Sequence, residues 1–422
     1  MRFLSEKQVR EITLKYGTPV YVYSEAVLKQ AAESLLAFPN AFGLTVRFAM
    51  KACPNRAILQ LLAQWGLQID ASSGFEVERA IMAGVAPHTI QLTSQQLTAN
   101  LLGLVKKGMR FNACSLHQLA EYGRICNNSR WREISLRVNP GLGSGHCQRT
   151  NVGGPSSSFG IWKDQIDLAQ DSTQRYGLKI TRLHTHIGSG SDPEVWVKVA
   201  KMSLAIAEQL PDIIVLNLGG GYKVGRIEGE KTTDLQVCGQ AVQTAFEEFA
   251  AKTGRKLHLE IEPGTYVVAE AGSIVARVID VVTTKPDPDG YDFIKVDSGM
   301  TENLRPSLYG AQHPITIVPQ LPDETRKTRN YVVVGHCCES GDILTPAAGN
   351  PETVATRELT EARVGDFAVV DFTGAYCAGM PGAGYNSFPA APEVLIRQGG
   401  TLQLIRQRQT LKQLVENEIG LN

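Results

Sequence analysis

The feature that most constrains the fold of this chain is a regular alternation of short apolar runs and longer helical patterns. Eight apolar runs rich in β-branched residues read as strands, at residues 44–50, 67–72, 89–94, 109–114, 133–140, 178–188, 213–220 and 256–264. Amphipathic stretches separate them, with apolar residues recurring at three and four. Repeated βα units imply parallel strands with right-handed crossovers. Eight such units within about 220 residues predict a closed (β/α)8 barrel of the TIM type, with an open doubly wound sheet as the alternative.

The character of the chain changes after residue 265. Runs at residues 267–284, 291–299, 330–338, 367–376 and 392–410 read as strands joined by Gly, Pro and Asp turns. This pattern predicts an all-β domain, a sandwich or small barrel, over residues 266–422. The N-terminal segment 1–24, which contains PVYVYS, is expected to complete it. The (β/α)8 barrel is then expected to occupy residues 25–265.

Composition excludes several classes of function. The 422 residues carry 42 basic and 42 acidic side chains, so no basic footprint for nucleic acid or an anionic membrane is expected. The polar start lacks a secretory apolar region, and no apolar run approaches the roughly 20 residues of a membrane-spanning helix. Eight cysteines without a C-x-x-C spacing indicate reduced thiols in a cytoplasmic protein.

Unusual polar residues stand at the ends of the predicted strands. In a barrel of this type, catalytic groups come from the C-terminal strand ends, which meet at one mouth. A single lysine after a strand is most simply interpreted as a surface residue, whose aliphatic chain lies along apolar surface while its ammonium group reaches water. The strand-end residues that together predict a site are Lys51, Asp70, Arg137, His186, the glycines Gly219, Gly220 and Gly221, and Glu262.

The residue types at this mouth favour pyridoxal phosphate as cofactor. The glycine run can form a backbone anion nest, and Ser189 with Gly190 offers further donors. A desolvated lysine is a nucleophile that can hold the cofactor covalently, and a carboxylate can keep its pyridine nitrogen protonated. His184 and His186 share one side of a strand, which suits a metal, but no third ligand accompanies them, so no metal is expected.

Motifs along nearly the whole chain resemble the fold-type III pyridoxal-phosphate-dependent decarboxylases. They include FAMKACPN, IDASSGFEVERA, HTHIGSGSD, LGGGY, EIEPG, RPSLYG, CCESGD and TGAY. The resemblance implies that Lys51 is the covalent and catalytic attachment point, that His186 stacks on the cofactor ring and that Glu262 pairs with its nitrogen. It implies further cofactor contacts from Asp70, Arg137, Ser189, Gly219, Gly220, Gly221, Pro263, Gly264, Thr265 and Tyr376.

The same resemblance implies the substrate side of the site. Arg305 and Tyr309 correspond to residues that bind the distal end of the substrate, and Tyr376 closes over substrate and phosphate. Cys338 corresponds to the catalytic proton donor and Glu339 to a substrate-binding acid, both supplied by the other subunit of a homodimer. The implied reaction is decarboxylation of meso-2,6-diaminopimelate to L-lysine.

The chain departs from the family pattern in two places. The family usually reads EPGR where this chain has Thr265, and Phe388 stands where some relatives carry arginine. The loss of two cations leaves a decarboxylase of another amino acid, such as D-lysine or D-ornithine, as the alternative. A racemase on the same barrel and a catalytically silent cofactor binder are further readings.

Overall fold

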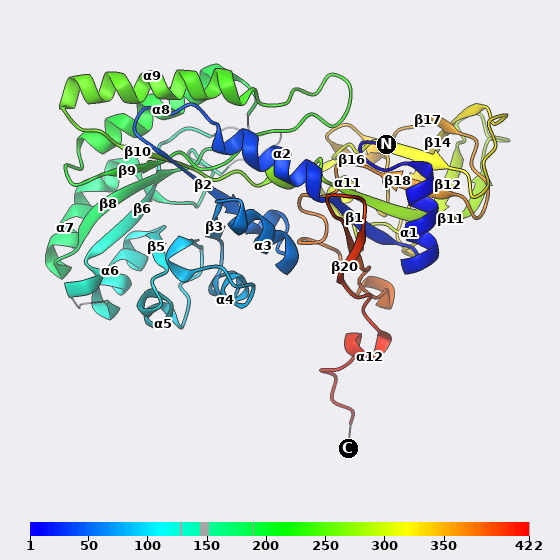
Figure 1. Ribbon diagram of the computed structural model, residues 1–422, viewed down its shortest axis with the longest axis horizontal. Helices are drawn as coiled ribbons and strands as arrows, with labels where there is room; N and C mark the ends of the chain where they lie inside the picture. The colour runs from blue at the N-terminus through cyan, green and yellow to red at the C-terminus, as the bar shows by residue number, and fades with distance from the viewer. Residues whose placement is uncertain (127–128, 144–151, 189, 422) are drawn as a thin grey trace. The chain divides into compact units, whose positions relative to one another are not determined.

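The computed structural model describes residues 1–126, 129–143, 152–188 and 190–421 (Figure 1). The chain forms two compact units. The barrel unit comprises Lys29–Val224 and Lys231–Val267. The sheet unit comprises Met1–Leu28, the short segment Gly225–Glu230 and Val268–Asn422. The segment Gly225–Glu230 therefore leaves the barrel unit and returns to it.

The barrel unit contains a closed sheet of parallel strands, which confirms the predicted (β/α)8 barrel and rules out the open sheet. Pairing of β10 with β2 and of β5 with β6 closes the ring, and the short β7 (Ile161–Trp162) adds beside β6. Each strand is shorter than the apolar run that predicted it. The eight barrel strands are β2 (Leu44–Ala49), β3 (Gln68–Ala71), β4 (Ile90–Thr93), β5 (Arg110–Ala113), β6 (Glu133–Asn139), β8 (Lys179–Thr185), β9 (Val215–Asn217) and β10 (His258–Ile261).

Helices cover the outside of the barrel (Figure 1). They are α3 (Arg56–Gln64), α4 (Gly74–Met82), α5 (Leu101–Lys106), α6 (Leu116–Ile125), α7 (Ile166–Tyr176), α8 (Pro193–Glu208) and α9 (Leu235–Thr253). Side chains that precede five of these helices accept hydrogen bonds from first-turn N–H groups, as N-caps do: Asn55, Ser73, Ser115, Asp192 and Asp234. The caps of α3, α4 and α6 follow β2, β3 and β5 within six residues, so these strand-end loops are short.

The sheet unit is built on one mixed nine-stranded sheet. The order β17-β14-β12-β11-β1-β19-β20 forms its main path, with β18 paired to β11 and β13. Its strands are β1 (Val20–Ser24), β11 (Gly272–Thr283), β12 (Asp292–Val296), β13 (Ile315–Val318), β14 (Thr328–Val334), β17 (Arg357–Thr360), β18 (Phe367–Val370), β19 (Glu393–Ile396) and β20 (Leu402–Arg406). A two-stranded sheet, β15 (Pro346–Ala347) with β16 (Asn350–Val354), stands apart.

The N-terminal segment is an integral part of the sheet unit, as the sequence predicts. β1 pairs antiparallel with β11 and parallel with β19. Helix α1 (Glu6–Tyr16) buries Val9 and Ile12 in a cluster with Val22 and Val394. Within the described part of the chain, no helix combines the length and apolar character needed to cross a membrane.

Candidate active site

The barrel places the predicted residues at or near the C-terminal ends of its strands. Lys51 lies in a single 3-10 turn, Met50–Ala52, directly after β2. Asp70 and Arg137 lie one and two residues before the ends of β3 and β6. His186 and Glu262 each follow a strand end, those of β8 and β10. The mouth is therefore populated from five different strands, as a barrel active site requires.

Glu262 is the best-supported group at this mouth. It is 6% exposed, and its Oε1 accepts hydrogen bonds from Asn217 Nδ2 at 2.7 Å and Gln91 Nε2 at 2.9 Å. Its Oε2 lies 3.1 Å from His184 Nε2. Burial acts to raise the pKa of Glu262, but His184 and Asn217 outweigh it and lower the pKa to about 2. Glu262 is thus held ionised inside the barrel.

The orientation of His184 follows from a chain of hydrogen bonds behind it. Asn112 Oδ1 accepts from Ser135 Oγ at 2.9 Å, so its amide Nδ2 faces His184 Nδ1 at 2.8 Å. An amide donor fixes Nδ1 of His184 as an acceptor and leaves the ring proton on Nε2. Nε2 is the ring atom that lies 3.1 Å from the Glu262 carboxylate. The resemblance and the strand pattern did not assign His184, Asn112, Asn217 or Gln91 to this role.

Asp70 is a second buried carboxyl group close to Glu262. Burial, and then the negative charge of Glu262, raise the pKa of Asp70 well above its usual range, although Lys51 opposes the shift. Its Oδ1 atom is buried without a hydrogen-bond partner among the described residues. The pKa values of two neighbouring carboxyl groups are therefore shifted in opposite directions, that of Glu262 downward and that of Asp70 upward.

His186 presents a neutral ring at the mouth. Burial, followed by the nearby cation Arg137, lowers the pKa of His186 well below its usual value. Its Nδ1 atom is buried and has no partner among the described residues. The ring lies 17° from parallel to that of His184, with centroids 6.5 Å apart. The Arg137 guanidinium carbon lies 4.7 Å from the centre of the Phe159 ring.

The glycine run after β9 lies so close to neighbouring residues that it has no room for a side chain. Gly219 has φ +72°, and a Cβ added there would lie 2.7 Å from His186. A Cβ on Gly220 would lie 2.3 Å from the carbonyl oxygen of Glu262. The carbonyl of Gly221 accepts a hydrogen bond from the Gly190 N–H at 3.1 Å. Only glycine allows the backbone to approach His186 and Glu262 this closely.

The EPG turn lies beside the first barrel strand. The Pro263 carbonyl accepts a hydrogen bond from Ala49 N–H at 3.1 Å, and the Gly264 carbonyl accepts one from Val267 N–H at 3.2 Å. Thr265 begins the short helix α10 (Thr265–Val268). Ser189 lies outside the described residues.

Lys51 is exposed, which corrects the expectation that the chain itself desolvates it. The apolar run that suggested burial ends at Met50, which is fully buried, and the 3-10 turn carries the next side chain out of the core. The lysine still acts electrostatically on Asp70 and His186. It therefore lies at the mouth and not within the barrel.

The sheet unit carries the residues predicted for the substrate. Arg305 and Tyr309 are the first and last residues of helix α11 (Arg305–Tyr309). The guanidinium carbon of Arg305 lies 5.9 Å from the ring centres of both Tyr309 and Tyr376. Tyr376 has a φ of 58°, a conformation that costs a non-glycine residue energy and that clusters at functional sites.

Cys338 and Glu339 lie exposed on a well-anchored loop of the sheet unit. Buried Asp342 anchors the loop by accepting hydrogen bonds from the N–H groups of Met300 at 2.7 Å and Cys337 at 2.9 Å. The Cys338 N–H donates to Asn386 Oδ1 at 2.8 Å. Burial and the Asp342 carboxylate raise the pKa of the neighbouring Cys337 to about 12, so Cys337 is a protonated thiol. Cys338 is the thiol that the loop presents outward.

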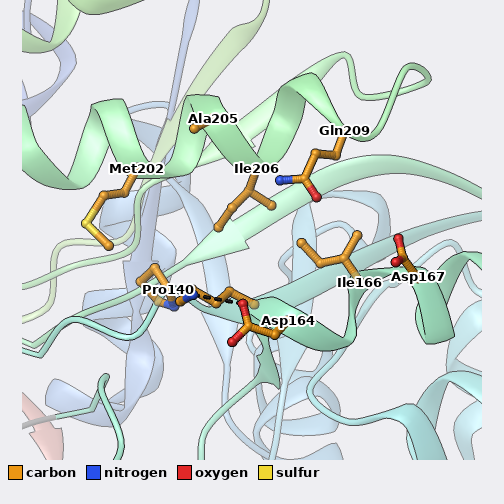
Figure 2. A pocket seen from close by; sticks show the side chains of 9 residues that line it. Pro140, Asp164, Ile166, Asp167, Met202, Ala205, Ile206 and Gln209 are labelled. Carbon is orange, nitrogen blue, oxygen red and sulfur yellow. Dashed lines mark hydrogen bonds and ion pairs between the residues drawn. The ribbon is translucent and has the colours of Figure 1, made fainter.

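A cavity on the barrel unit is a different feature. About 560 Å³ in volume, it is lined by residues before and at the start of α7 and by residues at the end of α8, namely Pro140, Lys163, Asp164, Ile166, Asp167, Met202, Ala205, Ile206 and Gln209 (Figure 2). Lys163 and Asp164 form an ion pair at its wall, 2.8 Å apart. None of the strand-end residues lines it, so it carries no part of the proposed chemistry.

The barrel mouth meets the requirements of pyridoxal phosphate on three observations. Glu262 is a buried, ionised carboxylate able to pair with a protonated ring nitrogen, and His186 offers an unpartnered neutral ring. The glycine run brings its backbone close to His186 and Glu262, where a Cβ would clash, and a run of this kind can form a backbone anion nest. This combination defines the class of barrel enzymes that use pyridoxal phosphate.

The chain belongs to the pyridoxal-dependent decarboxylase family, whose pyridoxal binding domain model matches residues 25–269. It is 35% identical to diaminopimelate decarboxylase of Escherichia coli, over 99% of this chain and 97% of that protein. It is 34% identical to diaminopimelate decarboxylase of Streptomyces coelicolor, over 96% of this chain and 90% of that one.

Solved structures agree with these relatives. A crystal structure of a diaminopimelate decarboxylase, 35% identical, superimposes with a TM-score of 0.89 and covers 98% of this chain and 96% of its own. Diaminopimelate decarboxylase of Helicobacter pylori complexed with L-lysine, 27% identical, gives 0.84 and covers 96% of this chain and 98% of its own. The family expected from the motifs is confirmed.

Proposed function

We propose that this chain decarboxylates meso-2,6-diaminopimelate to L-lysine with pyridoxal phosphate as cofactor. The observation that carries the proposal is the ionised Glu262 at the mouth of a barrel whose full-length relatives are diaminopimelate decarboxylases. When bound, pyridoxal phosphate supplies an electron-withdrawing ring that accepts the electron pair left behind as the α-carboxylate departs as carbon dioxide.

The residues of the barrel unit hold and tune that ring. Lys51 is the nucleophile that attaches the cofactor covalently. Glu262, ionised and fixed by Asn217, Gln91 and His184, keeps a proton on the ring nitrogen. His186 would stack on the ring face, and its neutral state avoids placing a second cation there. The glycine run Gly219, Gly220 and Gly221 would hold the phosphate with Ser189 and the EPG turn, through the backbone N–H groups of Gly220 and Gly221, because the Gly219 N–H donates to Asn217 Oδ1 at 2.8 Å.

The residues of the sheet unit recognise the substrate. Arg305 offers a planar fork to a carboxylate, and Tyr309 offers a hydroxyl. Tyr376, in its strained backbone conformation, closes over the substrate. Because Thr265 lacks the cation of the family pattern, a substrate without the second carboxylate, such as D-lysine or D-ornithine, is the competing assignment.

The proton that replaces the lost carboxylate comes from Cys338, with Glu339 holding the substrate ammonium. Both side chains are exposed, which supports their use by a second copy of the chain. The working enzyme is then a homodimer that shares its sites. Seven described cysteines are free, which supports a reducing, cytoplasmic setting.

Carbon dioxide release tests the assignment. Purified holoenzyme is incubated with meso-diaminopimelate and with lysine and ornithine in both hands. We expect diaminopimelate to be favoured by at least about 100-fold in kcat/KM, because a site built for a second carboxylate rejects analogues that leave its donors unpaired. Faster release from lysine or ornithine would replace the substrate and keep the reaction, whereas cofactor absorbance without any release would indicate a silent binder.

A further inference from the structure

Two arginines of the sheet unit keep hydrogen-bond donors buried without partners. Arg226, in the short segment Gly225–Glu230, has both Nε and Nη2 buried and unpaired among the described residues. Arg305, the first residue of α11, has its Nε in the same condition. A buried guanidinium donor without an acceptor is costly, because it has lost water and gained nothing in return.

The two arginines form one electrostatic cluster with His313 and Cys377, because each arginine acts on both of these residues. Burial, and next the positive charge of Arg305, lower the pKa of Arg226 to about 10. Burial lowers the pKa of His313 well below its usual value, and Arg226 and Arg305 add to the shift. The positive charges of both arginines also act on the pKa of Cys377. The Cys377 Sγ lies 3.3 Å from Asn303 Oδ1.

The neighbours of the two cations do not neutralise them. Burial raises the pKa of Cys377 to about 12 despite the arginines, so its thiol stays uncharged. His313 is a neutral ring whose Nδ1 contacts the Asp371 carbonyl at 3.0 Å. Among the described residues, Glu230 is the carboxylate that acts on Arg226, and it accepts a hydrogen bond from the Arg226 backbone N–H at 2.9 Å. The cluster therefore retains excess positive charge.

Two uncharged polar groups, each two residues from Arg305 in the chain, are also buried without hydrogen-bond partners among the described residues. Asn303 Nδ2 is buried without a partner, although Asn303 Oδ1 is used by Cys377. Ser307 Oγ, in α11, is buried and unpaired as well. Unpaired donors on two guanidinium groups, an amide and a hydroxyl together describe a site built for an anion that has several lone pairs.

We propose that Arg226 and Arg305 together bind the carboxylate of the substrate that is remote from the reacting carbon. Arg226 thereby becomes a specificity-determining residue of the reaction, and it supplies a second cation for a dicarboxylic amino acid. The inference rests on the proposed function, which it deepens. An anion of the same chemistry is present in the cofactor phosphate, but the glycine run of the barrel unit already offers donors for that group.

The decisive variant is Arg226→Gln in the holoenzyme, with Arg226→Lys beside it. Arg329→Gln is the matched control, because Arg329 is a half-exposed surface arginine paired with Glu361 at 3.2 Å. We expect Arg226→Gln to lower kcat/KM for meso-diaminopimelate by about 100-fold or more, mainly through KM, as for loss of a charged partner. Residual lysine turnover and the cofactor dissociation constant should stay within about twofold of the control.

The melting temperature distinguishes a substrate-binding role of Arg226 from a purely structural role. Because Arg226 has buried, unpaired donors and is repelled by the positive charge of Arg305, its removal should leave the melting temperature unchanged or raise it. Arg226→Lys should restore part of the lost kcat/KM, since it returns the charge without the fork. A lower melting temperature with equal losses on both substrates would overturn the proposal, and so would a loss confined to cofactor affinity.

A binding assay separates this inference from the proposed function. Pimelate, a dicarboxylate without amino groups, is added to each holoenzyme and the melting temperature is measured. Stabilisation of the wild type that Arg226→Gln abolishes supports the anion site, even if diaminopimelate is not turned over. No stabilisation of the wild type, or equal stabilisation of the variant, overturns it.

Discussion

Asp70 and Glu262 are equivalent in the sequence, each a carboxylate at a strand end, yet the barrel shifts their pKa values in opposite directions. The difference arises from their neighbours: Glu262 receives three polar contacts, whereas Asp70 Oδ1 receives none among the described residues. Pairs of groups whose environments separate their pKa values mark acid–base assignments. Glu262, whose pKa is lowered, is the one suited to a ring nitrogen, and the raised pKa of Asp70 reduces the repulsion between the two groups.

At the residue scale, Lys51→Ala should abolish both the visible absorbance of the lysine-bound cofactor and all turnover. Lys51 is the lysine whose charge acts on both Asp70 and His186. The measurement is an absorbance spectrum with carbon dioxide release. Lys201→Ala, which alters a lysine 61% exposed on α8, is the control and should behave as wild type. A band that persists in Lys51→Ala would mean that another lysine holds the cofactor.

The role of the glycine run after β9 in cofactor binding can be tested by comparing two glycines that both have a positive φ. Gly219 (φ +72°) follows β9 and Gly177 (φ +63°) ends α7, but an added Cβ meets His186 only at Gly219. Gly177→Ala should cost about 1 kcal/mol of stability from left-handed strain alone. Gly219→Ala should also raise the cofactor dissociation constant about tenfold or more, because displacing a packed ring costs roughly 1–3 kcal/mol. Equal effects on cofactor binding, measured by absorbance titration, would refute that role.

The floor of the barrel is a second testable element, with a defined pH dependence. Glu260 is 1% exposed and bonds Arg47 at 2.9 and 3.1 Å and also Arg182. Burial opposes ionisation, but the two arginines lower its pKa from 4.5 to about 2. A depressed pKa stabilises the fold fully above pH 4.5, and this stabilisation is lost as the pH falls toward 2.

Glu260→Gln should therefore lower the free energy of unfolding at pH 7 by about 3–5 kcal/mol, the cost of breaking a buried pair. The difference from wild type should shrink as the pH falls below 4.5. All four tryptophans lie in the barrel unit, so tryptophan fluorescence in urea follows that unit. Glu33→Gln, which breaks the surface pair with Lys29, is the control and should change stability by less than about 1 kcal/mol. A constant difference across this pH range would contradict the assignment of Glu260.

Strand periodicity was sufficient to predict the barrel, because each βα unit carries its own local signal. The polar residues inside the strands carry no such local signal of their role in the site. Gln91, Asn112 and Asn217 lie within strands, and their role depends on neighbours that the closed ring brings together. Arg226 was missed for the same reason, since its partner Arg305 follows far along the chain. The exposure of Lys51 depends on a 3-10 turn that the apolar pattern does not encode.

At the scale of the whole molecule, the two units divide the chemistry. The barrel unit carries the cofactor residues, and the sheet unit carries Arg305, Tyr376 and the loop of Cys338. That loop is held by Asp342 beneath, and added Cβ atoms on Gly299 and Gly335 would lie 2.3 and 2.2 Å from the Asp342 carboxylate. A rigid loop that presents a thiol and a carboxylate outward is suited to complete a site on another copy of the chain.

Shared sites make a quantitative prediction about mixed dimers. A Lys51→Ala chain and a Cys338→Ala chain should each be inactive as homodimers, since every site lacks one group. After dissociation and random reassociation of equal amounts, half of the dimers contain both chains, and each has one intact site, so about one quarter of wild-type activity should return. Mixing two differently tagged copies of the Lys51→Ala chain is the control and should restore nothing. Proven heterodimers without recovered activity would show that Lys51 and Cys338 serve the same chain, and the homodimer would then have no part in the chemistry.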